Sequence, residues 1–378
     1  MTDKKRHLVV KIGSAVLMGS GGRMDRGAFC RLVEELAQIA RDGHGLILVT
    51  SGAVAVGRQK LGLDKRPTGD RNIPKLQALA ALGQSRLMQL YEEEFFHYGV
   101  DVAQVLLTRD DFNHRRRYLN ARHALAAIQG FGAVPIINEN DTVGTEEIRF
   151  GDNDQLAAMV AAMVGADTLT LLSDIDGVYT SDPRSDPSAV RLESVHAMDP
   201  ALDAMVGDTF DAQRGFGTGG MRTKIAAARI AGRAGIGTII APGKSAGVLA
   251  RVVRGDEGVG TFLKPDPDSD RMDGRKAWIS TGITPRGRIW CDAGAVEALR
   301  ARGKSLLPSG VIRVEGEFKE GEAVEVVTPE GRTFARGLAI YGAEAMRLIA
   351  GQRSERIEAL LGYHILDVAI HRDDLVLD

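Results

Sequence analysis

Cysteine is scarce in this chain of 378 residues, and the two that are present, Cys30 and Cys291, lie far apart in sequence. Two distant thiols make neither a disulfide framework nor a zinc ligand set, so a reducing, cytoplasmic compartment is the simplest environment. The eight histidines contain no His-Glu-x-x-His pattern. These absences exclude a small disulfide-stapled protein and a zinc enzyme of that type.

Long hydrophobic runs and an excess of charge of one sign are also lacking. The longest weakly polar stretch, 156–166, falls short of the ~20 residues that a membrane helix needs. We expect no secretory signal in the opening MTDKKRHLVVKIGS, because it has charges and only a few apolar residues before Lys11. The 48 basic and 50 acidic residues leave a net charge of −2. We therefore expect no membrane association and no dedicated nucleic-acid binder.

Short apolar runs alternate with helical patterns through the first two thirds of the chain. Helices are predicted after Asp25 and Pro74, and over 155–164 and 223–234. The apolar runs predict strands over 7–12, 45–50, 100–107, 133–138, 168–172 and 237–241. Continuous apolar strands separated by helices are typical of an α/β fold, an open and mostly parallel sheet sandwiched by helices.

The pattern changes after about residue 262. Residues 264–275, KPDPDSDRMDGR, are predicted to be a linker. Shorter, glycine-punctuated runs follow and predict a small β-barrel or sandwich. A helical pattern and then an extra strand in LLGYHILDVAIH are expected near the C-terminus. The predicted strands of this part are 278–280, 288–291, 311–315, 323–327 and 333–340; the predicted domains are 1–263, 276–352 and a C-terminal extension, 353–378.

Three glycine-containing segments have phosphate-binding character, namely 11–14, 51–57 and 217–224. The first two follow strands, the third precedes a helix, and two of them carry a lysine. In open α/β sheets, ligands bind beyond the carboxyl ends of the strands, where glycine lets backbone N–H groups approach an anion. Two known nucleotide-binding motifs are excluded. The glycines at 215–220 match a dinucleotide fingerprint but do not follow a strand, and the Walker-type sequence that ends at Ser245 lacks the required first glycine.

Acidic and amide residues gather at the same strand ends. NENDT (138–142) ends a strand, GDNDQ (151–155) opens a helix, and SDIDG (173–177) lies in a strand-end turn. A capping box from Asp152 and Gln155 explains part of the second cluster. This capping box gives no reason for Asn153 and Asp154. For the third cluster, an Asx turn around Gly177 explains the two aspartates as well as a binding role does.

Six motifs occur along the chain in this order: VKIGS, VTSGAVAVG, INENDTV, FGDND, LLSDIDGVYTSDP and GTGGMRTK. With these motifs the chain resembles the amino-acid kinase family, most specifically its glutamate 5-kinase branch. The resemblance covers residues 6–262. KAWIS, SLLPSGVIRVEGEF and RGLAIYGAEAMR resemble a PUA domain, a module associated with RNA. Together they imply the amino-acid kinase fold followed by a small PUA-like β-barrel domain.

The resemblance also implies a site. Lys11 and Lys224 would flank the transferring γ-phosphoryl group of ATP, Asp154 would hold both lysines, and Gly13 with the 52–53 N–H groups would cradle phosphoryl oxygens. Mg²⁺ would be carried by the nucleotide. Glutamate would be bound by Ser51, Asn153 and Asp141, the last as partner of its α-ammonium group. ATP would contact Lys11, Gly13, Ser173, Asp174, Thr218, Gly219, Gly220, Met221, Arg222, Thr223 and Lys224.

The implied reaction is the first step of proline biosynthesis, which yields the acyl phosphate L-glutamyl 5-phosphate. A carboxylate acceptor is already ionised at pH 7 and needs no general base. We expect proline to be an inhibitor, the chain to be a homo-oligomer, and glutamate-5-semialdehyde dehydrogenase to be a functional neighbour that consumes the labile product.

Two alternatives stay open. A kinase of the same fold could act on aspartate, N-acetylglutamate, carbamate or uridylate, although an acetylated or nucleotide acceptor would not require Asp141. An RNA-binding or RNA-modifying protein is the second, because of the C-terminal domain. Residues 275–350 hold twelve basic and nine acidic side chains, a surplus of three, which favours regulation or packing over RNA binding.

Overall fold

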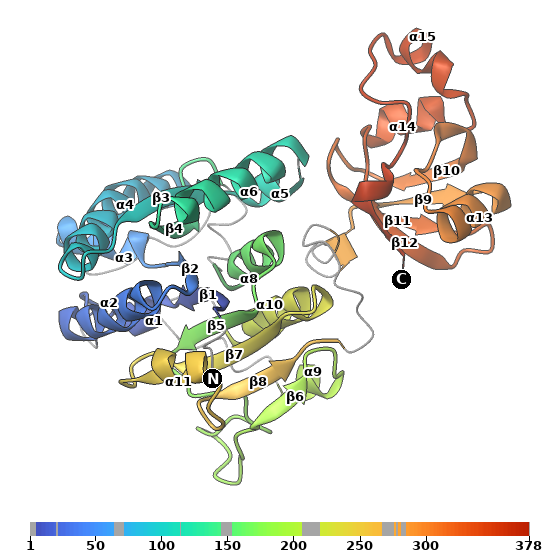
Figure 1. Ribbon diagram of the computed structural model, residues 1–378. Coiled ribbons are helices and arrows are strands. Elements are labelled where there is room, and N and C mark those ends of the chain that lie inside the picture. The colour runs from blue at the N-terminus through green and yellow to red at the C-terminus, as the bar shows by residue number, and fades with distance from the viewer. Residues whose placement is uncertain are drawn as a thin grey trace. The chain divides into compact units, whose positions relative to one another are not determined.

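The computed structural model describes residues 5–19, 22–63, 72–113, 115–144, 153–205, 220–266, 276, 279–280 and 285–377. The chain divides into two compact units, each described here by itself. The first comprises residues 1–111 and 116–274, and the second comprises residues 112–115 and 275–378. Figure 1 shows the elements of both along the chain.

A mostly parallel sheet forms the centre of the first unit (Figure 1). Among the described residues its strand order is β3-β4-β2-β1-β5-β7-β8-β6. Neighbouring strands run parallel except β7 and β8, which are antiparallel. The strands are β1 His7–Ile12, β2 Gly45–Val49, β3 Val102–Leu107, β4 Val134–Glu139, β5 Thr168–Ser173, β6 Ser194–His196, β7 Gly237–Pro242 and β8 Thr261–Lys264.

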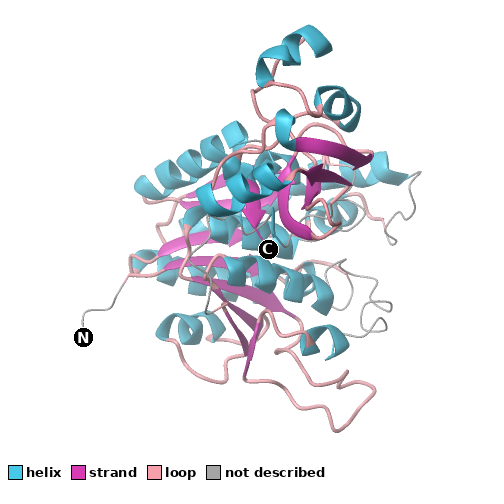
Figure 2. Ribbon diagram, turned by 90° about the vertical axis from the view of Figure 1, so that its right-hand side faces the viewer, coloured by secondary structure: helices cyan, strands magenta, loops and turns pink. Residues whose placement is uncertain are grey.

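Helices cover both faces of this sheet (Figure 2). On one face α2 and α4 pack with Leu8, Val10 and Ile12 of β1 into a buried cluster. On the other face α8 lies against β1 and β5, and α10 lies against β7. The helices are α1 Ser14–Leu17, α2 Arg26–Arg41, α3 Ala53–Lys60, α4 Ile73–Phe96, α5 Arg109–Asn113, α6 Arg115–Gly130, α8 Asn153–Val164, α9 Ala201–Met205, α10 Met221–Arg233 and α11 Val248–Arg254.

The local signals that predicted these helices act as expected. Asp25 caps α2, since its carboxylate accepts a hydrogen bond of 3.0 Å from the Ala28 N–H, and Pro74 lies in the first turn of α4. Helix α2 ends just before Gly43, which adopts a positive φ of 80°. The prediction of an α/β fold with a mostly parallel sheet is confirmed.

The second unit has a separate sheet with strand order β10-β9-β11-β12-β13. Its buried cluster includes Ile289, Val326, Phe334, Tyr341 and Met346, so it has a core of its own. Its elements are β9 Gly287–Cys291, α13 Ala293–Arg302, η3 Pro308–Gly310, β10 Val311–Gly316, β11 Ala323–Val327, β12 Thr333–Leu338, α14 Ala343–Ile349, η4 Ser354–Arg356, α15 Ile357–Leu361, η5 Arg372–Asp374 and β13 Leu375–Leu377.

Three details of the sequence prediction are wrong. Ile279 and Ser280, expected in a strand, are helical, while Trp278 lies outside the described residues. LLGYHILDVAIH forms no strand: within it Ile370 makes one isolated bridge to Leu306, and the strand β13 comes later. The segment 51–57 is a loop only as far as Gly52, because α3 begins at Ala53. The linker at 264–275 stays a prediction, since residues 267–275 lie outside the described part.

Two glycines set the crossing of α3 and α4. A Cβ atom on Gly57 would overlap with the Leu79 carbonyl oxygen, and one on Gly83 would overlap with the Ala53 carbonyl oxygen. Gly57 therefore serves a close approach of two helix backbones and not a phosphate loop. The crossing brings the middle of α4 against the segment that follows β2.

Small side chains also bring α8 and α10 together. Alanines on both helices are fully buried, and the two helices are in contact. Asp154 lies in the first turn of α8 and Lys224 in the first turn of α10. The two charged residues therefore lie at the same end of the helix pair. The buried alanines are Ala157, Ala158 and Ala161 on α8 and Ala227, Ala228 and Ala231 on α10.

Candidate active site

Lys11 is the starting point of the candidate site. Side chains alternate along a strand, and Leu8, Val10 and Ile12 of β1 point into the cluster with α2 and α4. Lys11 therefore points to the opposite face, where α8 and α10 lie. It is 4% exposed, so a full positive charge is buried at the carboxyl end of the central strand.

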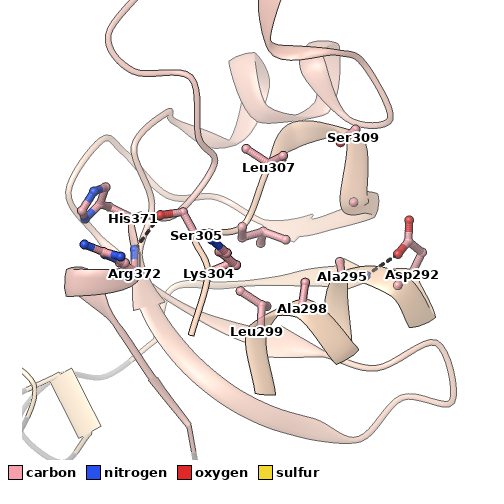
Figure 3. Close-up of a pocket in the computed structure, with 13 residues that line it drawn as sticks. Asp292, Ala295, Ala298, Leu299, Lys304, Ser305, Leu307, Ser309, His371 and Arg372 are labelled. Atoms are coloured by element: carbon pink, nitrogen blue, oxygen red, sulfur yellow. Dashed lines mark hydrogen bonds between the residues drawn. The ribbon is translucent and has the colours of Figure 1, made fainter. Parts of the chain in front are cut away.

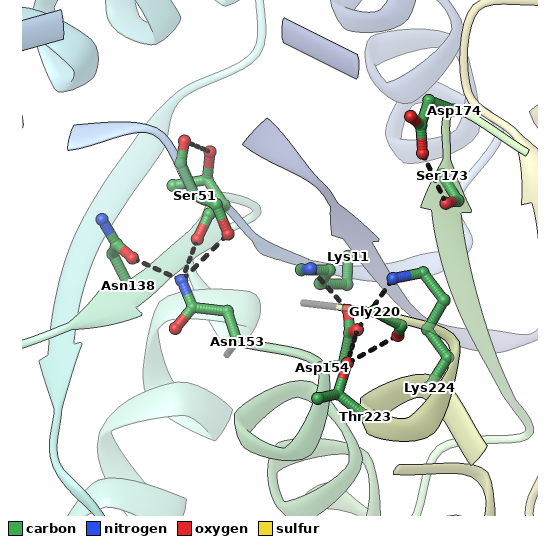
Figure 4. A network of polar contacts seen from close by, with 11 residues as sticks. Lys11, Ser51, Asn138, Asn153, Asp154, Ser173, Asp174, Gly220, Thr223 and Lys224 are labelled. Carbon is green, nitrogen blue, oxygen red and sulfur yellow. Dashed lines mark hydrogen bonds and ion pairs between the residues drawn. The ribbon is translucent and has the colours of Figure 1, made fainter. Parts of the chain in front are cut away.

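Asp154 joins the two lysines (Figure 4). Its Oδ1 forms an ion pair with the Lys11 ammonium group, and its Oδ2 lies 3.0 Å from Lys224 Nζ. The Thr223 hydroxyl donates a further hydrogen bond of 3.0 Å to Oδ2. Asp154 has no exposed surface, and Lys224 is 5% exposed. The prediction that Asp154 lies between Lys11 and Lys224 is matched by this geometry.

Opposing effects act on the Asp154 carboxyl. Burial alone would raise its pKa, but the charges of Lys11 and then Lys224, with hydrogen bonds from both ammonium groups, outweigh burial and hold the pKa well below its usual range. Asp154 is therefore an anion at neutral pH. The three groups together carry one net positive charge, which suits an anionic ligand.

Gly13, expected to help hold phosphoryl oxygens, uses its own N–H within the sheet. The Gly13 N–H donates a hydrogen bond of 3.2 Å to the Leu172 carbonyl oxygen, because β1 and β5 continue their pairing to this residue. The site also has little room at Gly13, since a Cβ there would lie 3.2 Å from the same oxygen and 3.9 Å from Lys11 Nζ. The contribution of Gly13 to holding phosphoryl oxygens stays a prediction.

Gly52 provides the second glycine of the site. It has a φ of 99°, a left-handed conformation that favours glycine, and α3 begins directly after it. A Cβ on Gly52 would lie 4.0 Å from the Ser14 Cβ atom. The segments after β1 and after β2 therefore lie side by side, with the N-terminus of α3 between them.

The amide group of Asn153 connects the ends of two strands (Figure 4). Its Nδ2 donates to the Thr50 carbonyl oxygen at 2.6 Å and to Asn138 Oδ1 at 2.7 Å, and lies 3.1 Å from Ser51 Oγ. Asn153 and Asn138 are 6% and 3% exposed. Asn153 and Ser51, both predicted to bind the acceptor, are thus brought together beside Asp154.

Asn138 and Gln84 belong to the same group of amides. Asn138 donates from Nδ2 to Gln84 Oε1 at 2.7 Å and accepts from the Glu139 N–H at 2.9 Å. The motif NENDT contains Asn138, but the choice of Asp141 left it aside. Nothing in the sequence marks Gln84, because a glutamine within an amphipathic helix is ordinary surface composition. Only the α3–α4 crossing reveals it.

The other predicted residues lie around this centre. Asp141 is half-buried in the turn that follows β4, and so lies at the same edge of the sheet as Ser51. Ser173 ends β5 and donates a hydrogen bond of 3.3 Å to the exposed Asp174. Thr218 and Gly219 lie outside the described residues.

The remaining residues predicted to contact the nucleotide lie at the start of α10. Gly220 is its N-cap, and its carbonyl oxygen lies 2.8 Å from Thr223 Oγ1, whose single hydrogen it shares with Asp154. The Met221 side chain is buried, 4% exposed, like that of Lys224 on the same helix. Arg222 is exposed and lines a cavity of about 330 Å³ together with Leu202, Asp203, Ile225, Ala226 and Arg229.

The second unit contains a cavity of about 640 Å³ (Figure 3). Ala295, Ala298 and Leu299 of α13 form an apolar wall, and Lys304 and Arg372 place two cations at its edge. The described residues bring no three His, Cys, Asp or Glu side chains together as a metal site. No helix of the described chain is both long and apolar enough to cross a bilayer.

Comparison with known proteins gives a matching family model for each of the two units. Residues 6–242 match the family model described as amino acid kinase family, and residues 287–361 match the model described as PUA domain. A glutamate 5-kinase of Pelobacter propionicus is 48% identical over 375 residues, 99% of this chain and 98% of its own. A glutamate 5-kinase of Pseudomonas putida is 49% identical over 100% and 99% of the two chains. One of Myxococcus xanthus is 49% identical over 98% and 96%.

Proposed function

Because this chain belongs to the amino acid kinase family, and over its full length to the glutamate 5-kinases within it, we propose that it transfers the γ-phosphoryl group of ATP to the side-chain carboxylate of L-glutamate. The observation that supports this most is the buried arrangement of Lys11, Asp154 and Lys224 at the carboxyl edge of the sheet. Phosphoryl transfer asks a protein mainly for positioning and for cationic stabilisation of the transferring group, and two fixed ammonium groups supply both.

Each lysine has a separate part in this proposal. Lys11, fixed at the end of β1, faces the γ-phosphoryl group from the side of the sheet. Lys224, in the first turn of α10, faces it from the side of the nucleotide. Asp154 touches no substrate: it is a positioning residue that keeps both ammonium groups in place before ATP arrives, so that little reorganisation is needed during transfer.

The acceptor lies beyond the ends of β2 and β4 in the proposal. Ser51 and Asn153 bind polar groups of glutamate, and Asp141 pairs with its α-ammonium group. The glutamate carboxylate is ionised at neutral pH and attacks phosphorus directly, so the site needs no general base. The product is the mixed anhydride L-glutamyl 5-phosphate, and ADP leaves.

ATP extends from the two lysines toward Ser173, Asp174 and the start of α10. A magnesium ion would supply charge neutralisation on the phosphates. Asp154 fits poorly as its ligand, because both of its oxygens are engaged by ammonium groups. The nucleotide phosphates themselves would therefore provide the oxygens that hold the ion.

We expect Asp141→Asn to raise the KM for glutamate by about 10- to 100-fold, the effect of losing a charge-assisted hydrogen bond. The KM for ATP should change by about twofold at most. Steady-state kinetics with each substrate varied in turn measures both constants. Asp174→Asn is the matched variant on the nucleotide side and should show the reverse pattern. Equal changes in both constants for Asp141→Asn would contradict its assignment.

ATP consumption against a panel of acceptors tests the proposed function. We expect turnover with L-glutamate, and less with L-aspartate, N-acetyl-L-glutamate, carbamate or UMP by at least about tenfold. Proline added to the glutamate reaction should lower the rate. If another acceptor on the panel gave a higher rate, that acceptor and not glutamate would be the substrate.

The second unit has a regulatory role in the proposal, since the residues assigned to chemistry all precede residue 225. A chain ending after Asp266 should fold and phosphorylate glutamate, while its response to proline or its assembly state should change. Turnover, proline inhibition and mass by light scattering, compared with the full chain, check this. A monodisperse truncated protein without glutamate-dependent ATP consumption would make the second unit part of the catalytic machinery.

The proposal carries further expectations. The acyl phosphate must be consumed by a reductase, which in proline biosynthesis is glutamate-5-semialdehyde dehydrogenase, in the cytoplasm. A homo-oligomer is expected. RNA binding by the second unit would be weak and salt-sensitive, since the basic surplus is small. Lys304 and Arg372 at the edge of its cavity are the cations to test for that property.

A further inference from the structure

The amides of Asn153, Asn138 and Gln84 form a hydrogen-bonded chain whose direction is fixed. At one end Asn153 Nδ2 meets the Thr50 carbonyl oxygen, which can only accept. In the middle Asn138 Oδ1 meets the Glu139 N–H, which can only donate. These two backbone groups settle which atom of each asparagine is oxygen and which is nitrogen.

The same reasoning fixes Gln84. Because Asn138 presents its Nδ2 to α4, the atom of Gln84 that faces it at 2.7 Å must be the oxygen. Gln84 is 9% exposed, and its Nε2 is buried without a hydrogen-bond partner among the described residues. Rotating the amide to give Nε2 a partner would place two donors against each other at Asn138. A buried amide thus leaves one donor unused in order to present an oxygen to Asn138.

The position of Gln84 depends on the helix crossing. Gly83, the residue before it, lies against the Ala53 carbonyl oxygen, and no side chain larger than hydrogen fits there. One turn and two turns further along α4, Leu87 and Tyr91 are buried on the same face, and the Tyr91 hydroxyl lies 2.9 Å from Thr50 Oγ1. The helix therefore anchors the end of β4 through Gln84 and the end of β2 through Tyr91.

We infer that Gln84 is a positioning residue for the acceptor substrate, acting through Asn138 on Asn153. Without the Gln84 oxygen, the Asn138 amide keeps the Glu139 N–H but loses its second anchor, so its Oδ1 is held less firmly against Asn153. Asn153 then loses part of the support from one of the three acceptors around its Nδ2, beside Ser51 and Asp154. This inference rests on the proposed function, because it assumes that Ser51 and Asn153 bind the acceptor.

Gln84→Met tests the inference, because methionine has similar length and presents no oxygen. We expect the KM for the acceptor to rise about tenfold, equivalent to about 1.4 kcal/mol, with the KM for ATP unchanged within about twofold. Gln89→Met makes the same change at an exposed position on α4, where the amide donates a hydrogen bond to Glu93, and should leave both constants unchanged. If Gln84→Met does not fold, Gln84→Leu replaces it.

A double-mutant cycle separates positioning from general loosening of the fold. In an Asn138→Ala background, Gln84→Met should no longer change the acceptor KM, since the group through which it acts is gone. Additive effects, a rise in both KM values, or a result equal to that of Gln89→Met would overturn the inference. The constants are measured for whichever acceptor the unsubstituted enzyme uses, so a failure of glutamate as substrate is seen separately.

Discussion

Lys224→Ala and Lys11→Ala should each lower kcat by about 10²- to 10³-fold, the usual effect of removing one preorganised donor from a developing charge. The reason is geometric. Each lysine side chain is at most 7% exposed and its ammonium group is held by Asp154, so it stands in place before the nucleotide binds. A water molecule in the space left by alanine carries no full charge. Initial-rate measurements at saturating ATP and glutamate give kcat directly.

Lys60→Ala is the matched control, because Lys60 is exposed in the last turn of α3. It should retain kcat within about twofold. Circular dichroism and thermal unfolding establish that each variant is folded. If a folded Lys11→Ala or Lys224→Ala variant retained a third or more of the kcat, the assigned role of that lysine would be wrong.

Asp154→Asn should affect both stability and catalysis. Removing the one anion between two buried cations leaves them facing each other, and breaking a buried ion pair typically costs about 3–5 kcal/mol. We expect the free energy of unfolding to fall by about that amount and kcat to fall at least 10²-fold. Chemical denaturation and steady-state kinetics measure the two effects. In the unsubstituted protein the pKa of Asp154 is lowered, so its stabilisation is fully present above about pH 4 and is lost only as the pH falls toward the folded value.

Asp203→Asn is the control for this experiment. Asp203 also pairs with a basic residue, Arg229, but its side chain is 68% exposed, and exposed pairs contribute about 0–1 kcal/mol. Its replacement should change the free energy of unfolding by about 1 kcal/mol at most. If the Asp154→Asn variant were as stable and as active as Asp203→Asn, the proposed role of the Asp154 carboxylate in holding the two lysines would be wrong.

The parallel sheet and its charged edge were predictable because the signals are local. Buried strands appear as continuous apolar runs, and parallel strands bring their carboxyl ends to one edge, so the segments that hold Lys11 and Ser51 were expected near each other. The place of Asn153 in the site followed from the resemblance. Lys224 came from a glycine-rich segment before a helix. The ion pairs of Asp154 followed from the resemblance and not from spacing.

Other features depend on tertiary contacts that no local pattern encodes. The pairing of the Gly13 N–H with the Leu172 carbonyl oxygen joins residues far apart in the sequence. Gly57 was taken for part of a phosphate loop, although its reason lies at Leu79 on another helix. Gln84 became visible only through its contact with Asn138, 54 residues away. The short strands β6 and β8 were missed because they carry too few residues to show alternation.

Trapping the product is the most direct test of the account. Hydroxylamine converts an acyl phosphate into a hydroxamate and releases phosphate, so a kinase that acts on the glutamate side chain must yield γ-glutamyl hydroxamate in its presence. The account predicts one hydroxamate per ATP consumed with L-glutamate, and at least about 10²-fold slower formation with Lys224→Ala under the same conditions. ATP consumption with glutamate that yields no hydroxamate would contradict transfer to the side-chain carboxylate.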